Sequence, residues 1–253
     1  MTKPPVLPGA EPMSVVGSNG HGALVLHGFT GSPQSMRGIA EAFAAGGYGV
    51  EMPLLPGHGT TVQDMLTTTW ADWSGHVEAV YEALAARVGR VVVVGLSMGG
   101  TLAAWLATRH SEIAGLVLIN GALEPMNADV RAMFQGMVDA GGTLIPGIGS
   151  DIAKPDTQEL AYLETPISGV LSLAAGGDEL DAALGSITMP SLVMYSPQDH
   201  VVPVTAAPYY AGKVAGPVEL VVLERSYHVA TLDYDADLII ERALGFAAKV
   251  CAA

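Results

Sequence analysis

Three polar residues, far apart in the chain, have the types and order needed for nucleophilic chemistry. Ser97 lies in Gly95-Leu96-Ser97-Met98-Gly99, a G-x-S-x-G motif, and Asp199 and His228 follow it in that order. A serine becomes a nucleophile when a histidine accepts its proton and a carboxylate orients that histidine. The order Ser, Asp, His is the one expected with a G-x-S-x-G motif. The spacing therefore predicts an acyl-transfer triad with Ser97 as nucleophile, Asp199 as acid and His228 as base.

The residues around Ser97 predict the turn that would expose its hydroxyl. The apolar run Val91 to Val94 is typical of a strand buried on both faces, and an alanine-rich, helix-favouring segment follows Ser97. Gly95 and Gly99 would let the strand and the helix approach closely. Ser97 then lies at a helix N-terminus, where backbone N–H groups favour negative charge. The alternative is a chance glycine-rich turn.

The other residues of the site are expected directly after predicted strands, because ligands of parallel α/β sheets bind at the carboxyl ends of the strands. His228 and Asp199 each follow a predicted strand closely. Asp233 and Asp235 lie nearer to His228 in sequence, but we expect them to cap the last helix. The other histidines are expected to support loops or to lie away from the site: His21, His27, His58, His76, His110 and His200.

An acyl-transfer site also needs two backbone donors for the oxyanion. One is the N–H of Met98, the residue after the nucleophile. The other is expected in the loop after the first buried strand, where His27-Gly28-Phe29 places the N–H of Phe29. We expect His27 to brace this loop by hydrogen bonding.

Composition limits the partners. The chain of 253 residues carries 11 basic and 25 acidic residues, a net charge of −14. This charge argues against nucleic acid and against electrostatic docking on anionic lipid. The motifs of metal sites are missing, as is a G-x-G-x-x-G after the first strand, so we expect no metal and no cofactor.

Cysteine content and the N-terminus bear on location. Cys251 is the single cysteine, which rules out an internal disulfide and suits a reducing compartment. No apolar stretch follows Lys3, and no apolar run approaches the length of a membrane span. We therefore expect a cytoplasmic protein without a signal peptide.

The order of elements predicts an α/β fold. Apolar strands alternate with helices, which specifies a mostly parallel sheet with helices on both faces. The alternation is interrupted between about residues 122 and 187, where an amphipathic helix carries Val130, Met133, Phe134, Met137 and Val138. We expect residues 1–121 and 188–253 to form the core and residues 122–187, the cap segment, to form an inserted cap. The alternative is that the apolar residues of this segment belong to the core.

Several segments resemble the α/β-hydrolase superfamily, and more particularly its bacterial monoacylglycerol lipase/carboxylesterase family, along nearly the whole chain. They are His27 to Pro33, Gly57 to Thr60, Gly95 to Thr101, Asp199 to Pro203 and Ser226 to Asp233, with Gly149 to Ile152 and Glu159 to Tyr162 in the cap segment. The resemblance implies an α/β-hydrolase fold, the same triad, and Phe29 and Met98 as oxyanion donors. It also implies that Glu159 holds glycerol hydroxyls and that Ile148 lines the acyl or glycerol end. Residues 122–143 match the family poorly, so the resemblance does not fix acyl-length preference.

The expected substrate is a small lipid ester, most particularly a monoacylglycerol, with at most transient membrane contact through the cap segment. Three alternatives stay open: a general short- or medium-chain carboxylesterase, a thioesterase or peptidase using the same triad, and a receptor on the same fold that binds a small molecule without turnover. The sequence does not indicate an oligomeric state.

Overall fold

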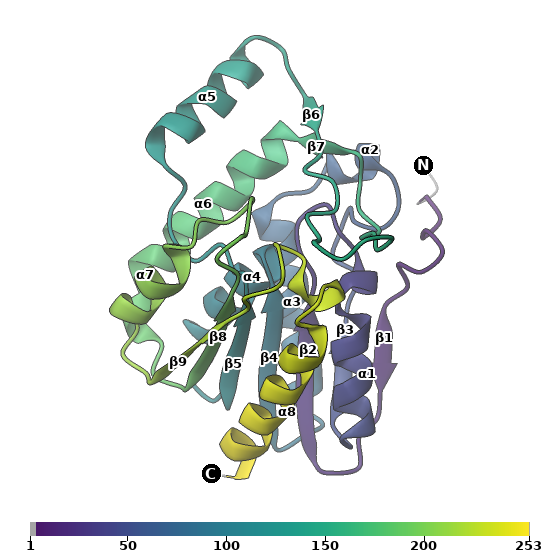
Figure 1. Cartoon of the computed structure of the whole chain (residues 1–253), viewed down its shortest axis with the longest axis vertical. Helices are drawn as coiled ribbons and strands as arrows, with labels where there is room; N and C mark the ends of the chain where they lie inside the picture. Colours follow the sequence, from purple (N-terminus) through teal and green to yellow (C-terminus); the bar gives the residue numbers. More distant parts are fainter. Residues whose placement is uncertain (1–3, 253) are drawn as a thin grey trace.

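The structure is a computed structural model that describes residues 4–252. The prediction that the chain has no signal peptide rests partly on residues 1–3, which lie outside the described residues. A seven-stranded sheet in the order β1-β3-β2-β4-β5-β8-β9 forms the centre of the molecule (Figure 1). All neighbouring strands are parallel except β1, which pairs antiparallel with β3 at one edge. The strands are β1 (Met13–Val15), β2 (His21–Leu26), β3 (Gly49–Met52), β4 (Arg90–Leu96), β5 (Gly115–Ile119), β8 (Ser191–Tyr195) and β9 (Val218–Val222).

The central strands are buried on both faces because successive side chains point to opposite sides. In β4, Val92 and Val94 belong to one apolar cluster and Val91 and Val93 to the other. The first cluster lies under α1 (Arg37–Ala45) and α8 (Ala236–Ala252). The second is covered by α3 (Trp70–Ala85), α4 (Met98–Ala107) and α7 (Ala206–Lys213). The fold is therefore the predicted three-layer α/β arrangement, with helices on both faces (Figure 1).

Short elements complete the core. They are η1 (Pro33–Met36), α2 (Val62–Met65) and η3 (Ala230–Leu232). A capping box opens α3 with Asp72 in the glutamate position, since the Asp72 carboxylate accepts the N–H of Thr69 at 2.9 Å. Within residues 4–252, no helix is both long enough and apolar enough to cross a membrane.

The cap segment lies between β5 and β8. It contains α5 (Ala128–Asp139), β6 (Leu144–Pro146), β7 (Glu164–Pro166), α6 (Ile167–Ala183) and η2 (Leu184–Ser186). Strands β6 and β7 form a separate antiparallel pair. The sequence predicts a continuous loop over residues 141–149, which is wrong at Leu144–Pro146, because a three-residue strand is too short to show an alternating pattern.

The two helices of the cap segment differ in their surroundings. Helix α6 packs against α3 and α4, whereas α5 contacts α6 and projects away from the sheet (Figure 1). No residue of α5, all of which the structure describes, is buried, and Met133 of its apolar stripe is 49% exposed. Arg131 of α5 binds the carboxylate of Asp178 in α6 at 2.6 Å. The apolar stripe of α5 therefore lies on the surface and not in the core.

Candidate active site

The turn between β4 and α4 holds Ser97 in a strained conformation. Ser97 has φ +55° and ψ −119°, a region that non-glycine residues rarely occupy. A Cβ on Gly95 would lie 2.1 Å from the carbonyl oxygen of Gly99, and a Cβ on Gly99 would lie 2.3 Å from that of Leu26. Only glycine fits at these two positions, as the sequence predicts. The turn leaves Ser97 partly exposed between two buried elements.

The loop after β2 lies directly beside Ser97. A Cβ on Gly28 would lie 3.3 Å from the Ser97 Cβ, so the backbone of this loop approaches the serine closely. The N–H of Met98 opens α4 and belongs to the first helical turn, whose amides have no intrahelical acceptor. Phe29 follows Gly28 in the same loop. The structure thus brings both expected oxyanion donors to the loops that flank Ser97.

His27 fixes the orientation of the Gly28–Phe29 peptide. The Leu55 N–H donates to His27 Nε2 at 3.2 Å, so the ring proton is on Nδ1, which donates to the Gly28 carbonyl oxygen at 2.9 Å. In a trans peptide the carbonyl and the following N–H point in opposite directions. A bond that holds the Gly28 carbonyl therefore also directs the Phe29 N–H.

His27 and His58 form a buried neutral pair beneath this loop. Their ring centroids are 5.0 Å apart, and His58 also contacts the rings of Phe29 and Trp73. Burial lowers the pKa of His27 to about 4, and it lowers the pKa of His58 well below its usual value. Neither histidine is placed to exchange a proton at neutral pH, which fits the supporting role expected for both.

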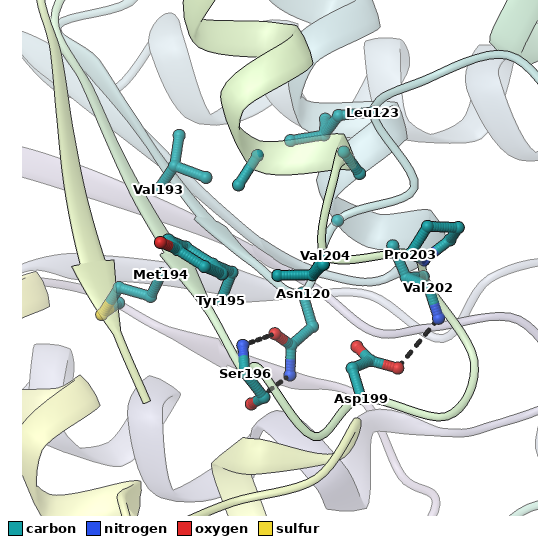
Figure 2. A pocket seen from close by; sticks show the side chains of 13 residues that line it. Asn120, Leu123, Val193, Met194, Tyr195, Ser196, Asp199, Val202, Pro203 and Val204 are labelled. Carbon is teal, nitrogen blue, oxygen red and sulfur yellow. Dashed lines mark hydrogen bonds between the residues drawn. The ribbon is translucent and has the colours of Figure 1, made fainter. Parts of the chain in front are cut away.

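His228 and Asp199 are in direct contact. His228 Nδ1 lies 2.8 Å from Asp199 Oδ2, and both side chains are nearly buried. The other carboxylate oxygen of Asp199 accepts the N–H groups of Val201 and Val202 at 2.8 Å each, and Figure 2 shows the bond from Val202. Because Nδ1–H donates to the carboxylate, Nε2 is the free base of the imidazole.

The two rival carboxylates have other partners. Asp235 accepts the Ser226 hydroxyl at 2.8 Å and binds Arg225, and Asp233 accepts the Tyr227 N–H at 3.0 Å. Both side chains hold the loop that precedes α8, and the carbonyl oxygen of Asp235 also accepts the Ile239 N–H at 2.9 Å, which places Asp235 at the start of this helix as the sequence predicts. Of the three aspartates, Asp199 is the one paired with the His228 ring.

Asn120, directly after β5, is a site residue that the sequence analysis missed. The residue is 3% exposed, and its backbone has φ +43°. The amide nitrogen donates to the carbonyl oxygen of His228 at 2.7 Å, and the amide oxygen accepts the Ser196 N–H at 2.8 Å. Figure 2 shows Asn120 facing Ser196 beside Asp199. Asn120 therefore ties together the two loops that carry Asp199 and His228.

The cap segment places Glu159 near the site and Ile148 on the surface. A Cβ on Gly31 would lie 2.5 Å from Glu159 Oε1, so this carboxylate lies against the loop that carries Phe29. Burial raises the pKa of Glu159, whereas the charge of His228 and a hydrogen bond from Ser35 act in the opposite direction. Ile148 is 67% exposed.

A cavity of about 460 Å³ lies between α4, the start of the cap segment and α6. Thr101, one turn after Ser97, lies on its wall together with Leu173 and Val202. The volume is in the range of ligand pockets. The space beside Asp199 in Figure 2 is only about 10 Å³, too small for a ligand. Among the described residues, no three His, Cys, Asp or Glu side chains gather as metal ligands would.

Comparisons with known proteins show the family to which the chain is related. The model of the alpha/beta hydrolase family matches residues 23–242. A thermostable monoacylglycerol lipase from Bacillus sp. (strain H-257) is 47% identical over 250 residues, which are 97% of this chain and 97% of that protein. A carboxylesterase from Bacillus subtilis (strain 168) is 25% identical over 90% of this chain and 92% of its own length.

Solved structures give the same result. A structure from work on LipS and LipT, two metagenome-derived lipolytic enzymes, superposes with a TM-score of 0.92 at 44% identity and covers 97% of this chain and 100% of that chain. A monoacylglycerol lipase from Paleococcus ferrophilus, 16% identical, shares the fold with a TM-score of 0.77 and covers 93% of this chain and 99% of that one. The chain belongs to the α/β-hydrolase family, within its bacterial monoacylglycerol lipase/carboxylesterase branch.

Proposed function

We propose that the protein is a serine esterase that hydrolyses monoacylglycerols to glycerol and a fatty acid. The observation that carries the proposal is the 2.8 Å contact between His228 Nδ1 and Asp199 Oδ2, in a fold that presents Ser97 on a strained turn. The 47% identical relative, named a monoacylglycerol lipase, supports the choice of substrate. Ser97 is proposed as nucleophile, His228 as base and Asp199 as the acid that orients it.

The proposed reaction has two halves. His228 Nε2 takes the Ser97 proton as Oγ attacks the ester carbonyl, and the resulting imidazolium returns the proton to the departing glycerol oxygen. The acyl group then remains on Ser97. A water molecule, deprotonated by His228, attacks this acyl-serine, and the fatty acid leaves as the proton returns to Ser97.

The negative charge of both tetrahedral intermediates falls on the former carbonyl oxygen. We propose that the N–H groups of Met98 and Phe29 bind this oxygen. Fixed donors of this type contribute strongly because they need no reorganisation during the reaction. The bond from His27 to the Gly28 carbonyl supports this role, since it directs the Phe29 N–H without using that N–H.

The two ends of the substrate are assigned to different parts of the cap segment. The apolar walls of the 460 Å³ cavity suit an alkyl chain, and Thr101 on its wall lies one helical turn from Ser97. We propose that Glu159 accepts hydrogen bonds from the glycerol hydroxyls. Its carboxylate lies beside Gly31, and the charge of His228 acts to lower its pKa. The resemblance predicts that Ile148 lines the acyl or glycerol end, and this stays a prediction.

The test is turnover of 1-monoacylglycerols and p-nitrophenyl esters by the wild type and by Ser97→Ala. We expect the wild type to hydrolyse both classes and the variant to lose turnover by roughly 10⁴-fold or more. Retained turnover in Ser97→Ala would refute the proposal. Binding without turnover across the panel would indicate a receptor, and preference for thioesters or peptides would reassign the leaving group.

Glu159→Gln tests the assignment of the glycerol end. This variant is expected to lower kcat/KM for monoacylglycerols about tenfold while p-nitrophenyl butyrate, which has no glycerol, is unaffected. Equal losses on both substrates would contradict the assignment. A cytoplasmic location and at most transient membrane contact through the cap segment remain predictions.

A further inference from the structure

One carboxylate of the cap segment reaches both loops of the proposed triad. Asp151 Oδ2 accepts the backbone N–H of His228 at 3.1 Å and that of His200 at 3.2 Å. Its other oxygen, Oδ1, lies 2.7 Å from His200 Nδ1, and its carbonyl oxygen accepts the Val229 N–H at 3.0 Å. His200 follows Asp199 directly, so Asp151 holds the backbone next to the acid and the backbone of the base at the same time.

The peptide groups on the two sides of His228 are therefore held from different parts of the molecule. Asn120, in the core, binds the His228 carbonyl oxygen, and Asp151, in the cap segment, binds the His228 N–H. With the backbone fixed on both sides, the ring has few ways to leave the 2.8 Å contact with Asp199. Without Asp151, the N–H side of His228 and the N–H of His200 lose their acceptor.

The burial of the Asp151 carboxylate strengthens its hydrogen bonds to the backbone of the two loops. Its side chain is 13% exposed, while that of His200 is 62% exposed. The contact with the exposed His200 ring contributes little in water, but backbone bonds to a nearly buried carboxylate are charge-assisted and stronger. The two backbone hydrogen bonds therefore contribute more to holding the triad loops than the contact with the His200 ring does.

The neighbouring cap residues are fixed to the same loop. Asp233 accepts the N–H groups of Ala153 and Lys154 at 2.7 and 3.0 Å and, with the same carboxylate, the Tyr227 N–H at 3.0 Å. The segment 151–154 and the loop 227–233 therefore exchange hydrogen bonds in both directions. This stretch of the cap segment is attached to the triad loops, in contrast to α5.

We propose that Asp151 is a positioning residue for the reaction, through which the cap segment holds His228 and the Asp199 loop in their reactive arrangement. The proposal rests on the proposed role of His228 as base. Its expected effect differs from that of a residue that only stabilises the cap segment. Loss of Asp151 should impair every ester, including esters too small to touch the cap segment.

The experiment compares Asp151→Ala, Asp151→Asn and Arg131→Ala with the wild type. The readouts are kcat and KM for p-nitrophenyl acetate and the rate at which a small fluorophosphonate modifies Ser97. For Asp151→Ala we expect kcat and the modification rate to fall about tenfold with KM nearly unchanged. Asp151→Asn keeps an amide oxygen for both N–H groups and should recover most of the loss. Arg131→Ala breaks the link between α5 and α6 without touching either triad loop, and should match the wild type.

The outcomes separate this proposal from the proposed function. Wild-type rates in Asp151→Ala on the small ester and the fluorophosphonate, with Ser97→Ala inactive, would overturn the role of Asp151 and leave the esterase standing. Equal losses in Asp151→Ala and Arg131→Ala would also overturn it, because general loosening of the cap would explain them. A wild type whose Ser97 does not react with the fluorophosphonate would refute the proposed function and this inference with it. Folding is checked by circular dichroism and urea unfolding. If Asp151→Ala does not fold, Asp151→Ser replaces it, because its shorter side chain cannot reach both N–H groups, and the same loss in kcat and modification rate is expected.

Discussion

The proposed site has two parts that differ in burial: the core side, formed by the sheet and the loops that follow its strands, and the cap side, formed by the cap segment. The core side holds its residues in buried, closely packed backbone, whereas much of the apolar surface of the cap side is exposed. On the core side, Gly95 and Gly99 leave no space for a side chain, and Asn120 is almost fully buried. On the cap side, Ile148 and the stripe of α5 face outward. This difference indicates that most of the proposed triad geometry is held by closely packed core backbone, while the apolar surface of the cap segment takes little part in holding it. Asp151 is the residue where the two sides meet.

The largest effect that would test this division is expected from Asp199→Asn. The amide cannot hold the His228 tautomer that leaves Nε2 free, so kcat should fall about 10³- to 10⁴-fold on short and long esters alike. The measurement is kcat for p-nitrophenyl acetate and for a monoacylglycerol. Asp235→Asn, which changes a rival carboxylate, serves as the control and should lose less than tenfold. A reversed ranking would move the acid to Asp235.

Asn120→Asp tests whether the core side holds both triad loops. Aspartate lacks the N–H groups that Asn120 donates, and its carboxylate would face the carbonyl oxygen of His228. We expect the free energy of unfolding to fall by about 1–3 kcal/mol and kcat to fall about 10²-fold for every ester. Urea unfolding and kcat for p-nitrophenyl acetate measure the two effects.

The matched control is Asn19→Asp, the same change in an exposed loop, where the amide donates to the Gly46 carbonyl oxygen at 3.1 Å. This variant should behave nearly as the wild type. If both variants unfold alike while kcat is unchanged, the support of the triad by Asn120 is wrong.

The buried histidines of the core side predict acid sensitivity of the fold. Burial holds the pKa of His27 at about 4 in the folded protein, against about 6.5 when unfolded. Between about pH 6.5 and about pH 4, His27 therefore binds a proton in the unfolded chain but stays neutral in the folded protein. The stability due to neutral His27 is complete above that pH and is lost as the pH falls from about 6.5 to about 4. At about pH 5, the lowered pKa of His27 should reduce the free energy of unfolding by about 2 kcal/mol relative to neutral pH. The lowered pKa of His58 acts in the same direction.

His27→Asn checks this value. The amide can still donate to the Gly28 carbonyl oxygen but does not titrate. The difference in unfolding free energy between about pH 7 and about pH 5, from urea titrations, should shrink by about 2 kcal/mol. An unchanged difference would mean that His27 is not held neutral.

Gly177→Leu tests the cap side with the smallest expected effect. A Cβ on Gly177 of α6 meets no heavy atom within 4 Å among the described residues, and Gly177 lines the 460 Å³ cavity. The leucine side chain should occupy part of this space and lower kcat/KM for p-nitrophenyl laurate about tenfold relative to the butyrate. Stability should rise slightly, since leucine favours a helix more than glycine does.

Gly136→Leu in α5 is the control, because a Cβ there also meets nothing within 4 Å in the described structure and the residue lies outside the lining of the cavity. Its chain-length preference should equal that of the wild type. A shift in both variants, or in neither, would count against the cavity as the acyl site.

The features predicted well from the sequence are those with a local cause. The sharp turn at Ser97 follows from an apolar strand and glycines around one serine, and the alternation of strands and helices predicts the parallel sheet. Asp199 and His228 each follow a strand, which is why the sequence predicts that they lie at the same edge of the sheet. Asn120 follows a strand too, but a search restricted to titratable groups passes over an amide.

The remaining features depend on contacts that the sequence does not encode locally. An amphipathic pattern is the same whether its stripe is covered or exposed, so the position of α5 could not be predicted. Asp151 lies in a loop without periodicity, 49 residues from His200 and 77 from His228. Its contacts depend on how the cap segment folds back over the sheet.

The most direct test of the central claim is to trap the acyl-enzyme. Wild-type protein is mixed with 1-monopalmitoylglycerol, quenched in acid during turnover and digested, and the peptides are analysed by mass spectrometry. The account predicts a palmitoyl group on Ser97 in the wild type and neither adduct nor turnover in Ser97→Ala. A palmitoyl group on another residue, or hydrolysis that continues in Ser97→Ala, would contradict it.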